Sequence, residues 1–227
     1  MSLTKNLGAV LLAGMALSAC GKKQEAAPAD SAAPAATASA PAASDAAAQP
    51  VADEAALKKK AVDMALAEER IVSDARGQWA TAATASSTYA YEKAATATVP
   101  YAPMQATGKP NVESYGDDGN SWASEKSDAG IEWLQVDFAQ PVSATELRIR
   151  QNCEPGAIIK LELIDEQGGR HTVWEGVDEE KYPASTIAWF VRSFEATPYK
   201  AKGARITLAS NAVHGWNEID AVQLISQ

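Results

Sequence analysis

The alternation of apolar and polar residues predicts a β-sheet domain in the C-terminal part of the chain. From about Gln78 onward, apolar residues recur at every second position, as in strands with one buried face. Leu147 and Ile149, for example, alternate with Arg148 and Arg150. The pattern predicts strands over residues 131–138, 145–151, 158–164, 171–174, 187–194, 204–209 and 218–225. Turn-forming Pro, Gly and Asn residues separate these runs. About eight short strands without intervening helices indicate a jelly-roll β-sandwich, which we place at residues 77–227.

A helical pattern precedes the sheet domain. Within residues 53–73, Leu57, Ala61, Met64 and Ile71 recur near i, i+4 and i+7, with charged residues between them. We expect a helical spacer over residues 53–76 that packs this narrow apolar stripe on the domain. The alternative is a coiled-coil or partner helix, which one short stretch without sustained heptads supports less well.

The first 19 residues are typical of a secretory signal peptide. Lys5 precedes an apolar run over residues 7–17, which is shorter than the ~20 residues that a membrane-spanning helix needs. A motif that resembles the bacterial lipobox follows: Leu17-Ser18-Ala19-Cys20-Gly21. In that family the Cys thiol receives a diacylglycerol and the peptide is cut before it, so the resemblance implies a lipid anchor (palmitate or similar chains) on Cys20. The alternative is an ordinary signal peptide with an unrelated Cys.

The segment after the lipobox-like motif predicts where and how the domain is held. Inner-membrane lipoproteins carry Asp directly after the lipidated Cys, whereas Gly21 and Lys22 stand here, so the resemblance favours the bacterial outer membrane. Residues 20–52 consist mostly of Ala, Pro, Ser and Asp. Because such a composition buries too little apolar surface to offset the entropy of ordering, we expect a disordered tether.

Composition and charge exclude several classes of protein. The 227 residues carry a net charge of −9, which argues against nucleic acid as a partner, because phosphate binding needs a clustered basic surface. Two cysteines exclude a disulfide-rich scaffold and a thiolate zinc site. The sequence contains no nucleophile elbow, metal-binding His pair or Gly-rich phosphate loop. We therefore expect a non-enzymatic protein.

Three motifs resemble discoidin-type domains of the galactose-binding-domain-like superfamily. In chain order they are Ser86-Ser87-Thr88-Tyr89, the segment Gly116-Asp117-Asp118-Gly119-Asn120-Ser121-Trp122, and Glu132-Trp133-Leu134-Gln135-Val136-Asp137-Phe138. Residues 216–224 fit the same pattern, so the resemblance covers roughly residues 79–226. It implies a sandwich whose variable loops bind glycans or surfaces.

The resemblance also implies a structural calcium ion. Asp117, Asp118 and Asn120 offer the oxygen ligands that calcium prefers, in a turn that Gly119 permits. In related modules a carboxylate near the C-terminus shares the ion, and Glu218 matches that place. The alternative is an Asx-rich turn that is capped by its own side chains.

Residues near the expected turns are the candidate ligand contacts. Aromatic rings stack on sugar faces while polar neighbours hold the hydroxyls. The candidates are Tyr115, Tyr182, His214, Trp216 and Asn217, together with Arg150 and Asn152 on the polar face of one strand. The alternatives are that Trp216 plugs the end of the sandwich and that the arginine-bearing face is simply solvated. Four further tryptophans, Trp122, Trp133, Trp174 and Trp189, are expected in the core.

These features favour a non-enzymatic envelope lipoprotein whose discoidin-like domain binds a glycan or cell-wall polymer. A protein-interaction or structural envelope module is the first alternative, and a hydrolase is the second.

We predict that Cys20→Ser releases the protein from membranes and abolishes lipid labelling, because the thiol is the acylated group in a lipobox. Fractionation and labelling with palmitate measure both effects. Cys153→Ser, which removes the other thiol, should retain the lipid. Unchanged membrane association of Cys20→Ser would contradict the anchor.

Overall fold

The computed structural model describes residues 49–89 and 99–227, with side chains from residue 54 onward. The expected signal peptide, Cys20 and nearly all of the tether therefore lie outside the described residues. Helix α1 (Gln49–Val72) confirms the expected helix and begins four residues before residue 53. Within the described ranges, no helix is both long and apolar enough to cross a membrane.

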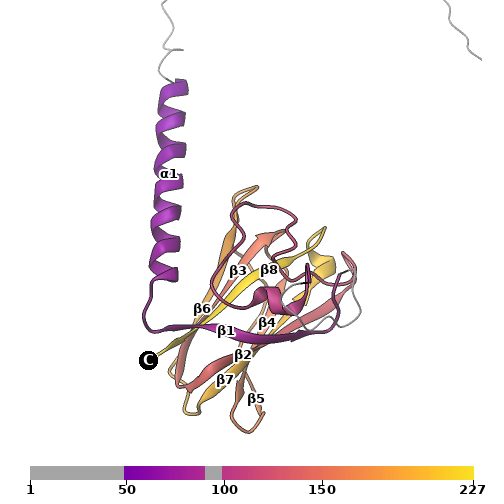
Figure 1. The fold of residues 1–227 in the computed structure, drawn as a ribbon. Helices are drawn as coiled ribbons and strands as arrows, with labels where there is room; N and C mark the ends of the chain where they lie inside the picture. The colour runs from indigo at the N-terminus through magenta and orange to yellow at the C-terminus, as the bar shows by residue number, and fades with distance from the viewer. Residues whose placement is uncertain (1–48, 90–98) are drawn as a thin grey trace, which may run out of the picture. The chain divides into compact units, whose positions relative to one another are not determined.

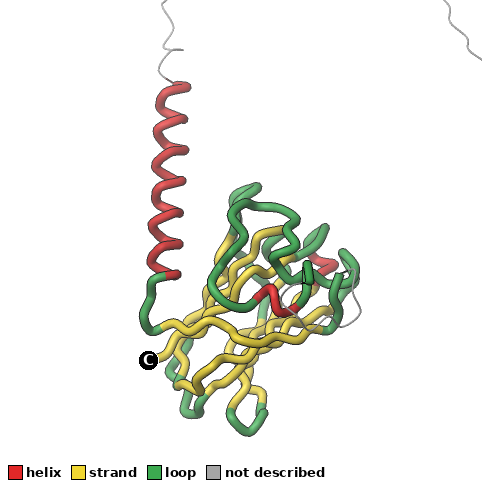
Figure 2. Tube along the Cα trace, in the orientation of Figure 1, coloured by secondary structure: helices red, strands yellow, loops and turns green. Residues whose placement is uncertain are grey.

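Eight antiparallel strands follow and confirm the mainly β fold (Figures 1 and 2). They are β1 (Gly77–Ala85), β2 (Ile131–Val142), β3 (Ala144–Cys153), β4 (Ile158–Asp165), β5 (Arg170–Glu175), β6 (Ala188–Ser193), β7 (Ala201–Ala209) and β8 (Glu218–Ser226). Two short 3-10 helices, η1 (Pro103–Ala106) and η2 (Ser210–Ala212), lie in the connections. All seven expected strands are present, and β1 is the additional one.

Strand β1 belongs to both layers of the sandwich. The overall order is β5-β4-β7-β2-β1-β8-β3-β6. Gly77, Gln78 and Trp79 pair with β8, whereas the residues from Ala80 to Ala85 pair with β2, and the register shifts between Ala80 and Ala82. A shift of this kind bends a strand, so β1 passes from one layer to the other and joins them along one side.

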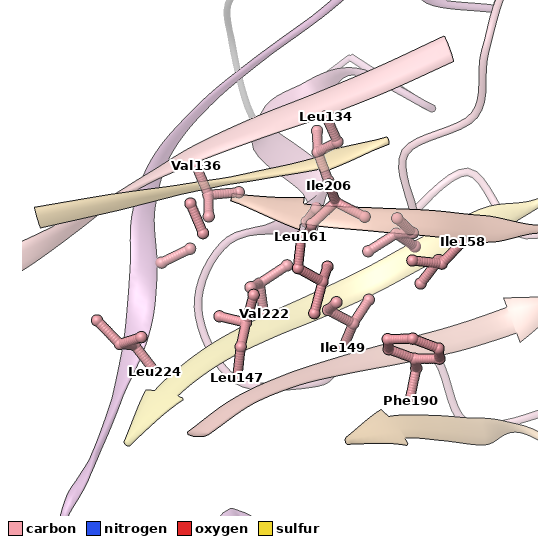
Figure 3. Packing of buried hydrophobic residues seen from close by; sticks show 14 of the residues in the cluster. Leu134, Val136, Leu147, Ile149, Ile158, Leu161, Phe190, Ile206, Val222 and Leu224 are labelled. Carbon is pink, nitrogen blue, oxygen red and sulfur yellow. The ribbon is translucent and has the colours of Figure 1, made fainter. Parts of the chain in front are cut away.

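The hydrophobic core fills the space between the two layers, as Figure 3 shows. Inward-facing residues of both sheets are almost completely buried: Leu134, Val136, Leu161, Ile206 and Leu208 from one layer, and Leu147, Ile149, Phe190, Val222 and Leu224 from the other. Each of these side chains contributes about 1.5–3 kcal/mol when it is fully removed from water. The period-two pattern of the sequence is thus the inward face of the sandwich.

The outer face of β3 is not the solvated surface that alternation suggested. Arg150 is only 4% exposed. Its Nη1 donates to the buried Asp220 carboxylate and, at 2.8 Å, to the Val112 carbonyl. Its Nη2 lies 2.8 Å from Glu68 Oε1 of α1. The alternative of a solvated arginine-bearing face is therefore wrong, because a charged strand face is covered when partners from other segments neutralise it.

Most of the apolar stripe of α1 does not pack on the sandwich as expected. Leu57 is 68% exposed and Met64 is 37% exposed. Only the last turns of the helix touch the domain, through Glu68 and through the Ile71 carbonyl, which accepts a hydrogen bond from Gln223 Nε2 at 3.2 Å. Strand β3 presents arginines to this part of the helix, and of the apolar stripe only Ile71, at its C-terminal end, is half-buried.

Candidate functional site: the loop end of the sandwich

The antiparallel topology gathers most of the candidate residues at one end of the sandwich, called here the loop end. It is where β1, β3, β5 and β7 finish and where β2, β4, β6 and β8 begin. The connections 86–130, 154–157, 176–187 and 210–217 meet there, and these carry the acidic turn and most of the aromatic candidates. Residues 90–98 of the first connection are not described.

The long connection between β1 and β2 is fastened to the last strand. Trp122 and Ile219 exchange backbone hydrogen bonds of 2.9 and 3.1 Å. Trp122 is 1% exposed, and its Nε1 donates to the Ser87 carbonyl at 3.1 Å. This tryptophan is a core residue, as expected, and it fixes the acidic turn that precedes it against β8.

Glu218 is the centre of the polar network at the loop end. The residue is 1% exposed. Its Oε2 accepts hydrogen bonds from the Ser121 hydroxyl at 2.6 Å, from Asn152 Nδ2 at 2.7 Å and from the Asp118 backbone N–H at 3.2 Å. Its Oε1 and the Oδ1 of Asn152 are buried and accept no hydrogen bond from the described residues. Two buried oxygen atoms thus lack a partner at one place.

The adjacent carboxyls of Glu218 and Asp117 form no ion pair with a cation in the part of the chain that the structure describes. Burial raises the pKa of Glu218 to about 7, despite the hydrogen bonds that it accepts, and the adjacent Asp117 carboxyl raises it further. Burial and the hydrogen bond to Asp117 raise the pKa of Tyr101 to about 12. The half-buried Cys153 thiol has its pKa raised to about 12 by burial, with Glu218 and Glu154 adding to the effect. The site therefore favours a positive ion over further negative charge.

The four expected calcium ligands do not all converge. Asp117 adjoins Glu218, as the resemblance implies. Asp118 Oδ1 instead accepts hydrogen bonds from the backbone N–H and from Nδ2 of Asn120, both at 2.9 Å. These side chains cap their own turn, which is the alternative stated above. No group of three or more His, Cys, Asp or Glu side chains forms a metal cluster in the described part of the chain.

Three aromatic rings form a second cluster at the loop end, called here the aromatic cluster. The rings of Tyr89 and Trp216 meet edge to face with centroids 5.4 Å apart, and those of Tyr89 and Tyr101 do so at 5.0 Å. Trp216 is 37% exposed and Tyr89 is 38% exposed. The indole Nε1 of Trp216 donates to the Ser124 carbonyl at 3.2 Å, which holds the ring in place. Trp216 therefore does not plug the sandwich.

The remaining candidates differ in how much of each side chain reaches solvent. The His214 side chain is 97% exposed, with Nδ1 lying 3.0 Å from Asp128 Oδ2. Asn217 is buried, and its Nδ2 donates to the Glu154 carbonyl at 2.7 Å. Hence only His214 of this pair can flank a ligand on Trp216.

The two other tyrosines are tied to carboxylates of the protein. The hydroxyl of Tyr115 donates to Glu154 Oε1 at 3.1 Å, and that of Tyr182 donates to Asp178. Arg150 and Asn152 are buried in the networks described above. These four residues therefore maintain the loop conformation, and none offers a free polar group at the surface comparable to His214.

Sequence reasoning did not single out Tyr89 and Tyr101 as site residues. Tyr101 has a φ of +62°, a left-handed conformation that is uncommon for a non-glycine residue and that collects at functional sites. No local sequence signal marks it.

Two of the tryptophans expected in the core, Trp133 and Trp189, are half-buried outside the hydrophobic cluster. Trp174 packs against the cluster from its edge.

Fold and site together define a jelly-roll module with a buried acidic network and an exposed aromatic cluster at its loop end. The model of the pappalysin-1 family, SD scarf domain, C-terminal, matches residues 70–227. Because this match spans more than half of the sequence, the chain belongs to that family. No curated protein matches the sequence significantly.

Solved structures with a similar fold include several modules with bound sugars. Chitosan-binding module 1 of a chitosanase/glucanase from Paenibacillus sp. IK-5 is 16% identical, with a TM-score of 0.45 over 65% of this chain and 95% of the module. The family 32 module of C. perfringens NanJ in complex with galactose is 16% identical, with a TM-score of 0.44, and the match covers 65% of this chain and 98% of the module. The lectin domain of lectinolysin complexed with Lewis B antigen is 15% identical, with a TM-score of 0.43, and the match covers 64% of this chain and 92% of the lectin domain.

We predict that, with a chelator present, the free energy of unfolding falls as the pH rises from about 5 to about 7.5. Glu218 has its pKa raised from 4.5 to about 7, so the folded protein holds an extra proton between these values. The resulting stability is fully present below pH 4.5 and is lost as the pH rises through 7. Urea unfolding at several pH values measures the slope.

The variant Glu218→Gln should flatten this dependence, because its amide stays neutral. Asp137→Asn, which neutralises an exposed carboxylate on β2, should keep the wild-type slope. An equal slope in the Glu218→Gln protein would show that another group titrates.

Proposed function

We propose that this chain is a non-enzymatic envelope lipoprotein whose β-sandwich binds a glycan or cell-wall polymer through the aromatic cluster. The observation that carries the proposal is the half-exposed Trp216 ring, which is held by Ser124 and buttressed edge-on by Tyr89. A rigid aromatic surface loses little conformational entropy on binding and stacks on the apolar face of a sugar ring.

Polar neighbours of the aromatic cluster supply the second part of sugar recognition. His214 beside Trp216 is almost fully exposed, and Asp128 lies against its ring. Sugar hydroxyls need donors and acceptors at the edge of the stacking surface, and this pair provides both. A protein partner is the alternative function, because aromatic rings with a polar rim also occur at protein interfaces.

The proposed location in the envelope rests on the N-terminal sequence. The lipobox-like residues up to Cys20 support a lipid anchor, and Gly21 after the Cys supports the outer membrane over the inner one. The part of the expected tether that precedes α1, residues 20–48, would hold the binding domain away from the bilayer surface. A coil of about 30 residues spans on the order of 30 Å.

A structural calcium ion is part of the proposal. Calcium binds oxygen ligands, and the buried unpaired oxygens of Glu218 and Asn152 adjoin Asp117 in a region of uncompensated negative charge. Asp117 and Glu218 would hold the ion, with carbonyl and amide oxygens completing the shell. Asp118 and Asn120 would contribute indirectly, by shaping the turn.

We predict that Trp216→Ala lowers the affinity for the bound glycan on the order of tenfold or more, as removal of a central aromatic anchor does. A glycan array and sedimentation with insoluble peptidoglycan measure binding by the purified chain. Tyr199→Ala is the control, since it removes an aromatic ring that stacks on His171 at the opposite end of the sandwich. Its binding should match the wild type.

Retention of neutral-glycan binding by Trp216→Ala would contradict the proposed site. The alternative function would be supported by two results together. The wild-type chain would bind an envelope protein but no glycan or peptidoglycan, and Trp216→Ala would no longer bind that protein.

We predict that calcium raises the melting temperature and that a chelator lowers it. A ligand that binds only the folded state at a hundredfold excess over its dissociation constant adds about 2.7 kcal/mol, which corresponds to roughly 5 °C for a domain of this size. Glu218→Gln should remove most of the response, whereas Asp118→Asn should keep much of it. A melting temperature that changes with neither calcium nor chelator would exclude the ion.

A further inference from the structure

The outer face of the β2–β7–β4 layer carries a half-buried arginine with an uncommon environment. Arg205 on β7 lies with its Cζ 3.8 Å from the ring centroid of Trp133 on β2. Its cross-strand neighbours are Gln135 and Glu162. Within residues 49–89 and 99–227, the guanidinium makes no hydrogen bond and no ion pair. Its donors therefore remain available to a ligand.

A second stacked arginine shows how unusual this is. Arg192 lies with its Cζ 3.8 Å from the Phe190 ring, yet its Nη2 also lies 3.4 Å from Asp178 Oδ1 and its Nη1 donates to the Val191 carbonyl at 2.8 Å. A guanidinium has five donors, and a partly desolvated one normally acquires acceptors. Arg205 has the stacking partner without the acceptors.

Charged side chains of both signs lie around Arg205: Lys160 and Arg170 are cationic, whereas Glu162, Glu175 and Asp137 are anionic. Glu162 pairs with two other cations. The Nζ of Lys160 lies 3.4 Å from its Oε1, and the Nη1 of Arg170 lies 3.8 Å from its Oε2. The exposed Glu175 lies 3.9 Å from Lys160. Burial and the neighbouring charge of Arg170 lower the pKa of Arg205, so a further anion beside these two groups would relieve their repulsion.

We propose that this face, formed by Trp133, Arg205 and Arg170, is a second binding site that takes the carboxylates of an acidic polysaccharide. A guanidinium stacked on tryptophan is held in plane and can bind a carboxylate through two parallel hydrogen bonds. Gln135 and Thr207 lie beside it on the same face, half-buried, and offer partners for sugar hydroxyls. The site shares no residue with the aromatic cluster and does not depend on the function proposed there.

The test compares two forms of one polymer. The purified chain is titrated with oligogalacturonides that carry free carboxylates and with the same oligosaccharides as methyl esters. We expect binding of the acid form only, weakening as salt is added. Arg205→Gln should reduce the affinity on the order of tenfold or more, because it removes a charge-assisted bidentate contact. The exposed Arg170→Gln should reduce it less.

Lys202→Gln is the matched control, since it removes one positive charge from the same strand at a side chain that contacts the Glu166 carbonyl instead. It should bind like the wild type, and Trp216→Ala should as well. Equal affinity for the ester, or unchanged binding by both arginine variants, would overturn the proposal. Binding of poly-glutamate with the same dependence on Arg205, and no binding of the polysaccharide, would also overturn it and assign the face to an acidic peptide.

Discussion

Strand β8 holds the loop end together, because its first two residues bind the long connection between β1 and β2 at two points. Glu218 receives the Ser121 hydroxyl and the Asp118 backbone N–H, and Ile219 pairs with Trp122 through the backbone. The described part of this connection has little regular structure of its own, apart from η1. The acidic turn and the aromatic rings therefore acquire their positions only when the last strand is in place.

The constraint at Glu218 has an electrostatic cost. A carboxylate is buried there among neutral donors and beside Asp117, so the folded state stabilises either a proton or a cation at this point. Arg150 and Asp220, further along the same sheet, illustrate the other solution, in which a buried carboxylate pairs with a buried guanidinium. Of these two buried carboxylates, Asp220 is paired with a guanidinium, and Glu218 at the loop end is not.

The alternation of apolar residues was sufficient to predict seven strands and the sandwich, but not β1. The sequence of that strand, from Gly77 to Ala85, is rich in Ala and Thr and has few large side chains, so its period is weak. The burial of Arg150 and Asn152 could not be predicted from the sequence either. Local alternation shows which side chains share a face of a strand, and it does not show which segment covers that face. Their partners, Glu68 and Glu218, are distant in sequence. The resemblance correctly predicted that Asp117 lies beside Glu218. It did not predict Tyr101 in the site, because no sequence pattern indicates the left-handed backbone conformation of this residue.

The two proposed surfaces differ in charge, and this difference determines which ligands each could take. Negative groups surround the aromatic cluster, since Asp117 accepts the Tyr101 hydroxyl and Asp128 lies against His214. An acidic polymer would be repelled there, so a neutral sugar suits that end of the sandwich. The face around Arg205 carries both signs of charge, and there the guanidinium without a hydrogen-bond acceptor would bind the carboxylate of an acidic polymer. In a chain with a net charge of −9, the charge of Arg205 and Arg170 acts on a ligand only at short range, because salt screens the field within about 8–10 Å. Recognition of an acidic chain would therefore depend on direct contact with the stacked guanidinium and not on long-range attraction.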